Sequence, residues 1–321
     1  MIKCGGFMKT VFVINPMAGK GKKIEKLTSD IYAVAERLGK ETECYVTKYQ
    51  GDATRFVKEY VGSARFIACG GDGTFSEVLN AVIDKAGSEA GVMPIGTGND
   101  FCRNFKDCNF ESIEAQFLGE TVPCDAIMYK TSDKAGYCAN MFNIGFDCNV
   151  ADKTSQIKKT TFLRGSFAYF MSIFIMLIKK KGANLFIELD GKPVHHGKLL
   201  LTSLANGSYC GGGIKSNPLS NVSDGVMNVN IVNNISRLKF ISLLPFYMKG
   251  THIKLKNIQN VIYSQDVKKA TITPLDKNMR ICVDGEIFDA GKTEFEVIPD
   301  AYRLVLPNFI QTKKQILSEL Q

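Results

Sequence analysis

The stretch FIACGGDGTFSEVLNAV, residues 66–82, joins an apolar run to an amphipathic one through the turn Gly70-Gly71-Asp72-Gly73-Thr74. Residues 64–69 are typical of a buried strand, and the apolar positions of residues 75–83 follow helical spacing. A glycine-rich turn between a strand and a helix lets backbone N–H groups approach a phosphate closely. A carboxylate in that turn would repel a bare phosphate, so we expect Asp72 to face a bound Mg²⁺ or to order the loop through hydrogen bonds.

The first third of the chain alternates strand patterns with helix patterns. Besides residues 64–69, three runs are expected to form strands: TVFVIN (10–15), ECYVT (43–47) and GVMPI (91–95). Further helices are expected over 24–38 and after Asp52, whose side chain would cap the helix N-terminus. This alternation predicts a parallel sheet covered by helices, with ligands at the carboxyl ends of the strands.

The sequence pattern changes after about residue 125, where short strand-like runs are separated by turn residues. They predict a mostly antiparallel second domain, a sandwich or an open barrel. A helix is expected there over 162–178, and the chain is expected to end in another helix over 307–321. The segment FMSIFIMLIKKK (170–181) is too short to span a bilayer, which needs about 20 apolar residues. It is either a core helix or an apolar face with a basic flank that meets a membrane surface.

Composition narrows the class of protein. The 321 residues allow two domains, and the net charge of +8 suits acidic partners such as nucleotides, anionic membranes or nucleic acid. Ten cysteines are scattered without a C-x-x-C pair, which disfavours a zinc ribbon or a redox pair and indicates reduced thiols. The apolar run Val11–Ile14 is too short for a secretory signal. We therefore expect a cytoplasmic protein.

Glycine-bearing loops follow three of the expected strands: residues 15–23, 70–74 and 96–103. Their coincidence at one edge of a parallel sheet predicts a phosphate site. Known nucleotide motifs do not account for it. The Walker pattern is missed by one residue at GEIFDAGKT (285–293), and the dinucleotide pattern fails because Ile24 stands where its third glycine would be.

Three of these segments resemble the N-terminal signatures of the diacylglycerol kinase catalytic family, which includes bacterial soluble lipid kinases and the sphingosine and ceramide kinases. The segments are NPMAGKGK (15–22), GGDGTFSEV (70–78) and GTGNDFCRNF (96–105). The resemblance continues through NMFNIGFD (140–147), LRGSFAY (163–169), NGSYCGGGIKSNP (206–218), SDGVMNV (223–229) and VDGEIFDAG (283–291). It covers nearly the whole chain. The G-G-D-G-T element by itself is less specific, because the related NAD kinases share it.

The resemblance implies an α/β nucleotide-binding domain, residues 1–128 with 301–321, and a β-rich, sandwich-like lipid-substrate domain, residues 129–300. ATP, Mg²⁺ and a lipid alcohol would meet in the cleft between them. The implied nucleotide contacts, with the rest of the third loop added, are Asn15, Pro16, Met17, Ala18, Gly19, Thr47, Gly70, Gly71, Asp72, Gly73, Thr74, Phe75, Ser76, Thr97, Gly98, Asn99 and Arg103. Arg103, Lys20 and Lys22 could offset charge that develops on the phosphates.

The family's D-G-E motif matches Asp284 and Glu286, one of which is implied to accept the proton of the lipid hydroxyl. Spacing alone favours a β-turn with solvated acids at this position. Asp72 and Asp125 would support the Mg²⁺ of the nucleotide.

A second, structural Mg²⁺ would use the loop of Asn221, Asp224 and Val226. Asn221 and Asn228 stand at two places where the family usually has acidic residues, so weaker divalent binding is expected there.

The expected function is an ATP-dependent lipid kinase of phospholipid biosynthesis that transfers the γ-phosphate of ATP to the hydroxyl of a diacylglycerol-like lipid. Diacylglycerol, phosphatidylglycerol and sphingoid bases remain open as substrates. The alternatives are an NAD kinase and a non-catalytic nucleotide or lipid sensor. The implied partners are a lipid alcohol and the inner membrane surface, contacted peripherally, and no nucleic acid. A homodimer is left open.

Overall fold

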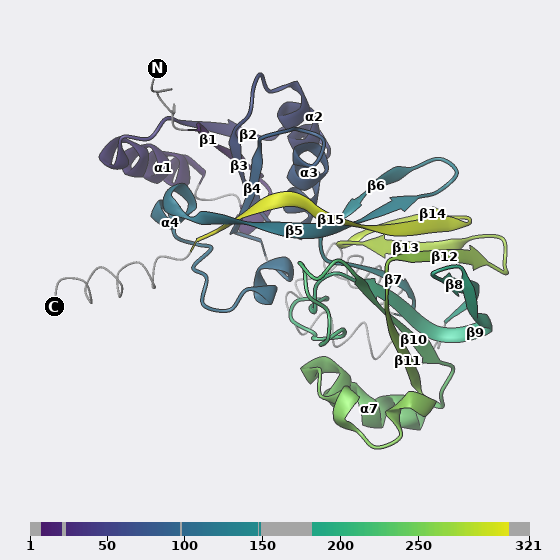
Figure 1. Cartoon of the computed structure of the whole chain (residues 1–321). Helices are drawn as coiled ribbons and strands as arrows, with labels where there is room; N and C mark the ends of the chain where they lie inside the picture. The colour runs from purple at the N-terminus through teal and green to yellow at the C-terminus, as the bar shows by residue number, and fades with distance from the viewer. Residues whose placement is uncertain (1–7, 21–23, 97, 147, 149–181, 308–321) are drawn as a thin grey trace. The chain divides into compact units, whose positions relative to one another are not determined.

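The computed structural model describes residues 8–20, 24–96, 98–146, 148 and 182–307 (Figure 1). The chain forms two compact units, Met1–Cys124 with Ala301–Gln321, and Asp125–Asp300. The helices expected over 162–178 and 307–321 lie outside the described residues, apart from Pro307, which precedes the second. None of the helices in the described ranges reaches the length and apolar content that crossing a bilayer requires.

The first unit is built on parallel strands, as the alternation predicts. They are β1 (Thr10–Ile14), β2 (Thr42–Val46), β3 (Arg65–Gly70) and β4 (Glu89–Pro94), hydrogen-bonded in the order β4-β3-β1-β2. The C-terminal part of β15 (Thr293–Leu306) pairs in parallel with β4. All five residues of β1 are buried, and so are five of the six in β3. This burial is expected for central strands that helices cover on both faces.

The helices of this unit are α1 (Ile24–Leu38), α2 (Asp52–Glu59), α3 (Asp72–Val82) and α4 (Ile113–Leu118). Short 3-10 turns occupy Ala18–Lys20 and Phe101–Asn104. Ile31 and Ala35 of α1 pack with Phe12 and Ile67 of the sheet in one hydrophobic core. The structure therefore confirms the predicted α/β class of the N-terminal part.

The expected role of Asp52 as a helix cap is wrong. Gly51 is the N-cap of α2, in a left-handed conformation with φ of 88°, and Asp52 is already helical. The buried Asp52 carboxylate instead accepts hydrogen bonds from Lys48 N at 2.8 Å and the Tyr45 hydroxyl at 3.0 Å, and it pairs with Arg55. Its side chain thus holds the loop between β2 and α2, rather than the first turn of the helix.

We expect Asp52→Ala to lower the free energy of unfolding by about 2 kcal/mol near neutral pH, because it leaves inward-pointing donors without an acceptor. Burial alone would raise the pKa of Asp52, but the hydrogen bonds from Lys48, Arg55 and Tyr45 lower it overall. The stabilisation is therefore complete above the unfolded pKa of about 4 and fades as the pH falls through the folded pKa. Urea unfolding at several pH values checks this, with the exposed Asp30→Ala as control. A difference from wild type that does not change with pH would contradict it.

The second unit is mostly antiparallel. Its strands are β5 (Glu120–Lys130), which enters from the first unit, β6 (Ala135–Cys138), β7 (Met141–Gly145), β8 (Ala183–Leu189), β9 (Lys192–Ala205), β10 (Met227–Asn233), β11 (Ile262–Val267), β12 (Lys269–Pro274), β13 (Met279–Val283), β14 (Glu286–Ala290) and the first part of β15. They pair in the order β14-β13-β7-β9-β8-β12-β15, with β10 between β9 and β11. Alternate residues such as Phe142, Ile187 and Phe295 fill one apolar core. The predicted β-rich class is confirmed.

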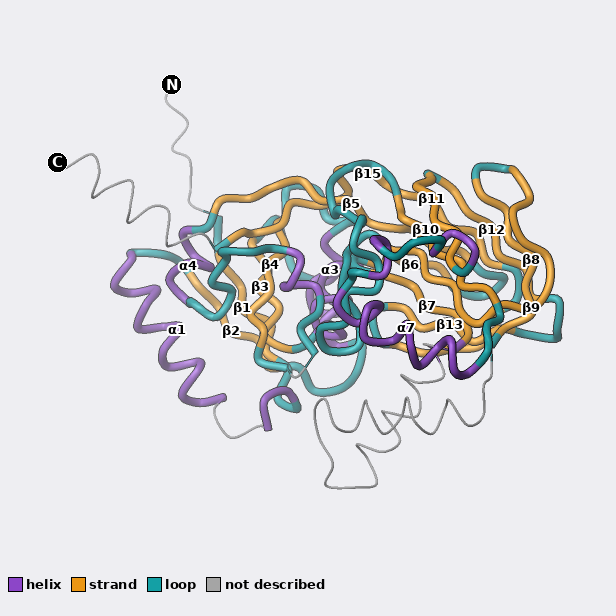
Figure 2. Tube along the Cα trace, turned by 90° about the horizontal axis from the view of Figure 1, so that it is seen from below, coloured by secondary structure: helices purple, strands orange, loops and turns teal. Residues whose placement is uncertain are grey.

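The helix α7 (Arg237–Lys249) was not expected from the sequence; Figure 2 shows it as a helix in the strand-rich second unit. Ser236 caps its N-terminus by accepting a hydrogen bond from Lys239 N, and Gly250 ends it with a φ of 69°. Two 3-10 turns follow, His252–Lys254 and Ile258–Asn260. Apolar residues lie all round α7, so its sequence lacks the one-sided period that marks a surface helix.

Candidate functional site

Main-chain hydrogen bonds join the loops that follow β1, β3 and β4 in the first unit. Ile95 N and Gly96 N, just after β4, both donate to the Gly70 carbonyl at 3.0 Å. Asn15 N, just after β1, donates to the Cys69 carbonyl at 2.9 Å. The three glycine-bearing loops therefore meet at the carboxyl ends of neighbouring parallel strands, where α/β sheets bind ligands.

Glycine is required where these loops touch. A Cβ on Gly96 would lie 2.6 Å from the Gly71 Cα, and one on Gly70 would lie 2.2 Å from the Thr74 Oγ1. Gly19 has a φ of 61°, and its Cβ would lie 3.0 Å from the Ile95 carbonyl oxygen. A larger residue at Gly96 would force the second and third loops apart, and one at Gly70 would clash with the Thr74 side chain within the second loop, so these glycines set how closely the backbone amides gather.

Asn15 ties the first loop to the start of α3. Its Nδ2 donates to the Thr74 hydroxyl at 3.0 Å, and its Oδ1 accepts from Met17 N at 2.9 Å. Gly71 is the N-cap of α3, and no side chain of the described residues caps it, so the first amides of the helix are open to an anion. The arrangement offers amides that lack an intrahelical partner, together with the positive end of a helix, at one point.

Asp72 is the first residue of α3, and its Oδ1 accepts a hydrogen bond from Phe101 N at 3.2 Å. The Asp72 carboxylate therefore ties the start of α3 to the third loop, a contact not expected from the sequence, and its role toward a bound Mg²⁺ stays a prediction. Its Oδ2 lies beside Gly98, where a Cβ would come within 2.8 Å. Asn99, at a φ of 54°, has a buried Oδ1 with no hydrogen-bond partner among the described residues.

The oxygens near Asp72 suit a phosphate-bound Mg²⁺. This ion prefers oxygen ligands and usually takes one or two carboxylates together with substrate phosphates. The Asp72 Oδ2 and the unsatisfied Asn99 Oδ1 are oxygens of that kind, and both lie beside glycines of the third loop. Within the described residues, no three His, Cys, Asp or Glu side chains are grouped to hold a metal without such phosphates.

The remaining predicted nucleotide contacts differ in how they are placed. Thr47 is buried, and its main-chain N–H donates to the Ile14 carbonyl at 2.9 Å, so it lies at the end of β1. The Arg103 side chain lies against the third loop. Its Nε is 3.6 Å from the Asp100 Oδ1, and its Nη2 is 3.5 Å from the Gly98 carbonyl oxygen. Thr97 and Lys22 lie outside the described residues.

In the second unit, Asp284 and Gly285 form the two-residue turn between β13 and β14. Both have positive φ, 45° and 94°, as a type I′ hairpin turn requires. The turn expected from spacing is therefore present, and Glu286 directly follows it as the exposed first residue of β14. The two carboxylates do not share one face of a regular strand, because Asp284 is in the turn.

The Asp284 carboxylate is held by donors from one neighbouring segment. It accepts hydrogen bonds from Ala139 N at 2.9 Å, Asn140 N at 3.2 Å, Met141 N at 3.0 Å and the Cys138 thiol at 3.2 Å. Burial and the nearby Asp284 charge raise the pKa of the Cys138 thiol well above its ordinary value, so the thiol stays a donor. Asp284 thus fixes the hairpin that presents Glu286.

The hydrogen bonds that hold residues 138–141 in place were not predicted from the sequence. Asn206 is buried, and its Nδ2 donates to the carbonyls of Asp125 at 2.8 Å and Ala139 at 2.9 Å. Asn140 Nδ2 donates to the Tyr209 carbonyl at 2.6 Å. The motif NGSYCGGGIKSNP (206–218) begins with Asn206, but no sequence pattern indicates that the Asn206 side chain donates to carbonyls far away in the chain.

The loop expected to hold a structural metal is ordered by its own hydrogen bonds. Asp125 accepts from Gly225 N at 2.7 Å and from Asp300 N at 2.9 Å, and Asp224 accepts from Val226 N at 3.2 Å. Asn221 Oδ1 accepts from Ser223. Asn228 donates to Asp266 at 2.7 Å. The metal-binding roles of Asn221, Asp224, Val226 and Asp125 stay predictions.

Burial, followed by the charges of Asp125 and Asp266, raises the pKa of Asp224. The ionised Asp224 therefore costs stability in the metal-free protein once the pH exceeds its folded pKa. We expect Asp224→Asn to be at least as stable as wild type in EDTA near neutral pH. Millimolar Mn²⁺ should raise the melting temperature of wild type and leave the variant unchanged. A thermal scan in which Mn²⁺ shifts both proteins equally would contradict a metal site at Asp224.

Comparisons with known proteins identify the class. The diacylglycerol kinase catalytic domain matches residues 9–129, and the YegS C-terminal NAD kinase beta sandwich-like domain matches residues 140–306. The "Probable lipid kinase YegS-like" of Serratia proteamaculans (strain 568) is 31% identical over 273 residues, which cover 82% of this chain and 83% of that protein. The "Diacylglycerol kinase" of Bacillus subtilis (strain 168) is 27% identical over 304 residues, covering 92% of this chain and 95% of that protein.

A crystal structure of a diacylglycerol kinase from Bacillus anthracis str. Sterne superimposes with a TM-score of 0.69 at 20% identity, covering 94% of this chain and 97% of that one. This likeness shows the two-domain fold. The two domains and the relatives together define a lipid kinase. The chain belongs to the diacylglycerol kinase catalytic family, as the sequence motifs predict. Membership of a kinase family implies ATP as the phosphoryl donor.

Proposed function

We propose that this lipid kinase transfers the γ-phosphate of ATP to the hydroxyl of a diacylglycerol-like lipid. The observation that carries the proposal is the meeting of three glycine-bearing loops at the uncapped start of α3, beside the Asp72 carboxylate. Phosphoryl transfer needs positioning and charge stabilisation more than covalent chemistry, and open amides with a metal-binding carboxylate supply both.

The nucleotide would lie on the first unit. Its phosphates would contact the loops of residues 15–19 and 70–76, mainly through the first amides of α3, with Thr47, Thr97, Gly98 and Asn99 completing the contacts and Arg103 offsetting negative charge. Asp72 and the Asn99 Oδ1 would hold the Mg²⁺, while Asp125, with its oxygens already bonded to two amides, would assist less. When bound, Mg²⁺ neutralises charge on the β- and γ-phosphates.

Glu286 would accept the proton of the lipid hydroxyl. The hydroxyl oxygen forms a bond to the γ-phosphorus as the bond from that phosphorus to the bridging oxygen breaks, and ADP leaves with the electron pair. Asp284 is the less suited base, because three amides and a thiol already donate to its carboxylate. Glu286 is exposed at the end of the hairpin, where a substrate hydroxyl could reach it.

We also propose that residues 1–128 with 301–321 act as the nucleotide-binding domain and residues 129–300 as the lipid-binding domain. The enzyme would be cytoplasmic and would meet its substrate by peripheral contact with the inner membrane surface. Its basic net charge of +8 supports contact with an anionic surface. The segment 170–181, in which the sequence suggests such a contact, lies outside the described residues. Assembly as a homodimer stays open.

The experiment that identifies the acceptor uses the purified protein with γ-labelled ATP, Mg²⁺ and a total lipid extract. Mass spectrometry of the labelled product is expected to show a phosphorylated diacylglycerol. If the labelled product is instead a phosphorylated sphingoid base or phosphatidylglycerol, the proposed acceptor is wrong, but the protein is still a lipid kinase. In a parallel reaction with NAD, formation of NADP⁺ without any labelled lipid would overturn the proposal in favour of an NAD kinase.

A further inference from the structure

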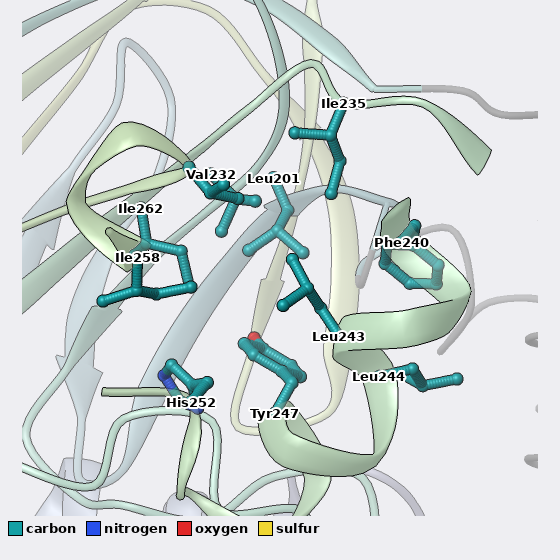
Figure 3. A pocket seen from close by; sticks show the side chains of 11 residues that line it. Leu201, Val232, Ile235, Phe240, Leu243, Leu244, Tyr247, His252, Ile258 and Ile262 are labelled. Atoms are coloured by element: carbon teal, nitrogen blue, oxygen red, sulfur yellow. The ribbon is translucent and has the colours of Figure 1, made fainter. Parts of the chain in front are cut away.

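One side of the helix α7 packs against the sheet of the second unit. In Figure 3, Leu243 and Tyr247 of α7 face Leu201 and Val232 of the sheet across a narrow apolar cavity. The cavity has a volume of about 30 Å³, room for little more than one water molecule. The inner side of α7 therefore packs against the sheet of the second unit, with a small apolar cavity beneath it.

The outer side of α7 is also apolar. Leu238 is 82% exposed and Ile241 is 51% exposed, while Phe246 and, beyond the helix, Ile253 are 42% and 39% exposed. No residue of α7 is fully buried. A helix that is apolar all round is normally covered on every side, by a protein core or by a membrane.

Positive charge surrounds these exposed side chains. Between Asp224 and Asp266 the sequence contains no acidic residue, and it contains five basic ones: Arg237, Lys239, Lys249, Lys254 and Lys256. All five are exposed, and the four lysines form no ion pair within the described part of the chain. His252 adds no charge near neutral pH, because burial lowers its pKa.

We propose that α7 and the turn after it dock on an anionic lipid bilayer. Exposed leucine, isoleucine and phenylalanine side chains can enter the boundary between headgroups and acyl chains, and lysines with long apolar stems can keep their ammonium groups among the phosphates. The complementary charge and the exposed apolar face together favour a membrane over an acidic protein. The inference rests on the proposed lipid kinase function, whose substrate lies in such a bilayer, and it assigns the surface that makes the contact.

Vesicle sedimentation of the full chain without ATP tests this docking surface. Wild type should bind vesicles containing phosphatidylglycerol and should bind pure phosphatidylcholine vesicles far more weakly. The variant K239Q/K249Q should bind anionic vesicles about 25-fold more weakly, at about fivefold per charge. The variant L238S/I241S should bind anionic vesicles at least about tenfold more weakly than wild type. The matched controls K58Q/K192Q and V61S/L275S change exposed residues elsewhere and should stay within about twofold of wild type.

Equal binding of wild type and both α7 variants would overturn the proposal, and so would equal binding to anionic and neutral vesicles. A dimer in gel filtration that L238S/I241S dissociates, with vesicle binding unchanged, would assign the face to a second copy of the chain and would also overturn it. Phosphorylation of a dispersed short-chain diacylglycerol is measured separately. If that reaction fails while α7-dependent binding persists, the proposed function is wrong and the docking surface stands.

Discussion

Glu286→Gln is expected to lower kcat about 1,000-fold with diacylglycerol and saturating ATP, since removal of a general base typically costs 10²–10⁴ in rate. The amide cannot take the hydroxyl proton, yet it keeps the size of the carboxylate. Because Glu286 is exposed, the melting temperature should change little. Steady-state kinetics and a thermal melt measure both quantities.

The matched control is Asp289→Asn. Asp289 is an exposed acid on the same strand, 3.8 Å from Arg280, and it should be dispensable for turnover. Asp284→Asn is expected to reduce activity together with stability, because its carboxylate anchors the hairpin through three amides. If Glu286→Gln keeps most of the activity while Asp284→Asn abolishes it in a protein of normal stability, the base is Asp284.

Gly96→Ala has the largest effect expected in the nucleotide site. Its methyl group would lie 2.6 Å from the Gly71 Cα and 2.9 Å from the Gly71 nitrogen, and neither backbone atom can rotate away. We expect a loss of about 1–3 kcal/mol in the free energy of unfolding. ADP binding should weaken at least about tenfold, because the second and third loops would separate.

Isothermal titration with ADP and urea unfolding measure the two effects. Gly291→Ala is the control, since no atom lies within 4 Å of a Cβ at that position. Wild-type affinity for ADP in Gly96→Ala would show that the contact between Gly96 and Gly71 does not shape the nucleotide site.

The sequence predicted the fold well where local patterns carry it. Short strand-like runs separated by amphipathic helices predicted the parallel sheet, and turn residues at short intervals predicted the antiparallel unit. Asp52 was misread because an aspartate before a helical pattern usually caps it, whereas here Gly51 takes that position and the carboxylate is used by Lys48. α7 was missed because a helix with apolar residues on every side has no distinctive period.

For the candidate site, motifs indicated the candidate residues but not the role of each one. The motif D-G-E left Asp284 and Glu286 equivalent. Only the folded chain shows that amides 145 to 143 residues away along the sequence bind Asp284. Likewise, the closeness of Gly96 and Gly71 depends on the pairing of β3 with β4. Long-range contacts of this kind leave no local pattern in a single sequence.

The most direct test of the central claim follows the γ-phosphate. Purified protein is incubated with γ-labelled ATP, Mg²⁺ and a diacylglycerol in mixed micelles, and the label is counted in the organic and aqueous phases. The proposal predicts time-dependent label in a single organic-phase phospholipid, reduced about 1,000-fold by Glu286→Gln. Label found in inorganic phosphate or in NADP⁺, with none in lipid, would contradict it.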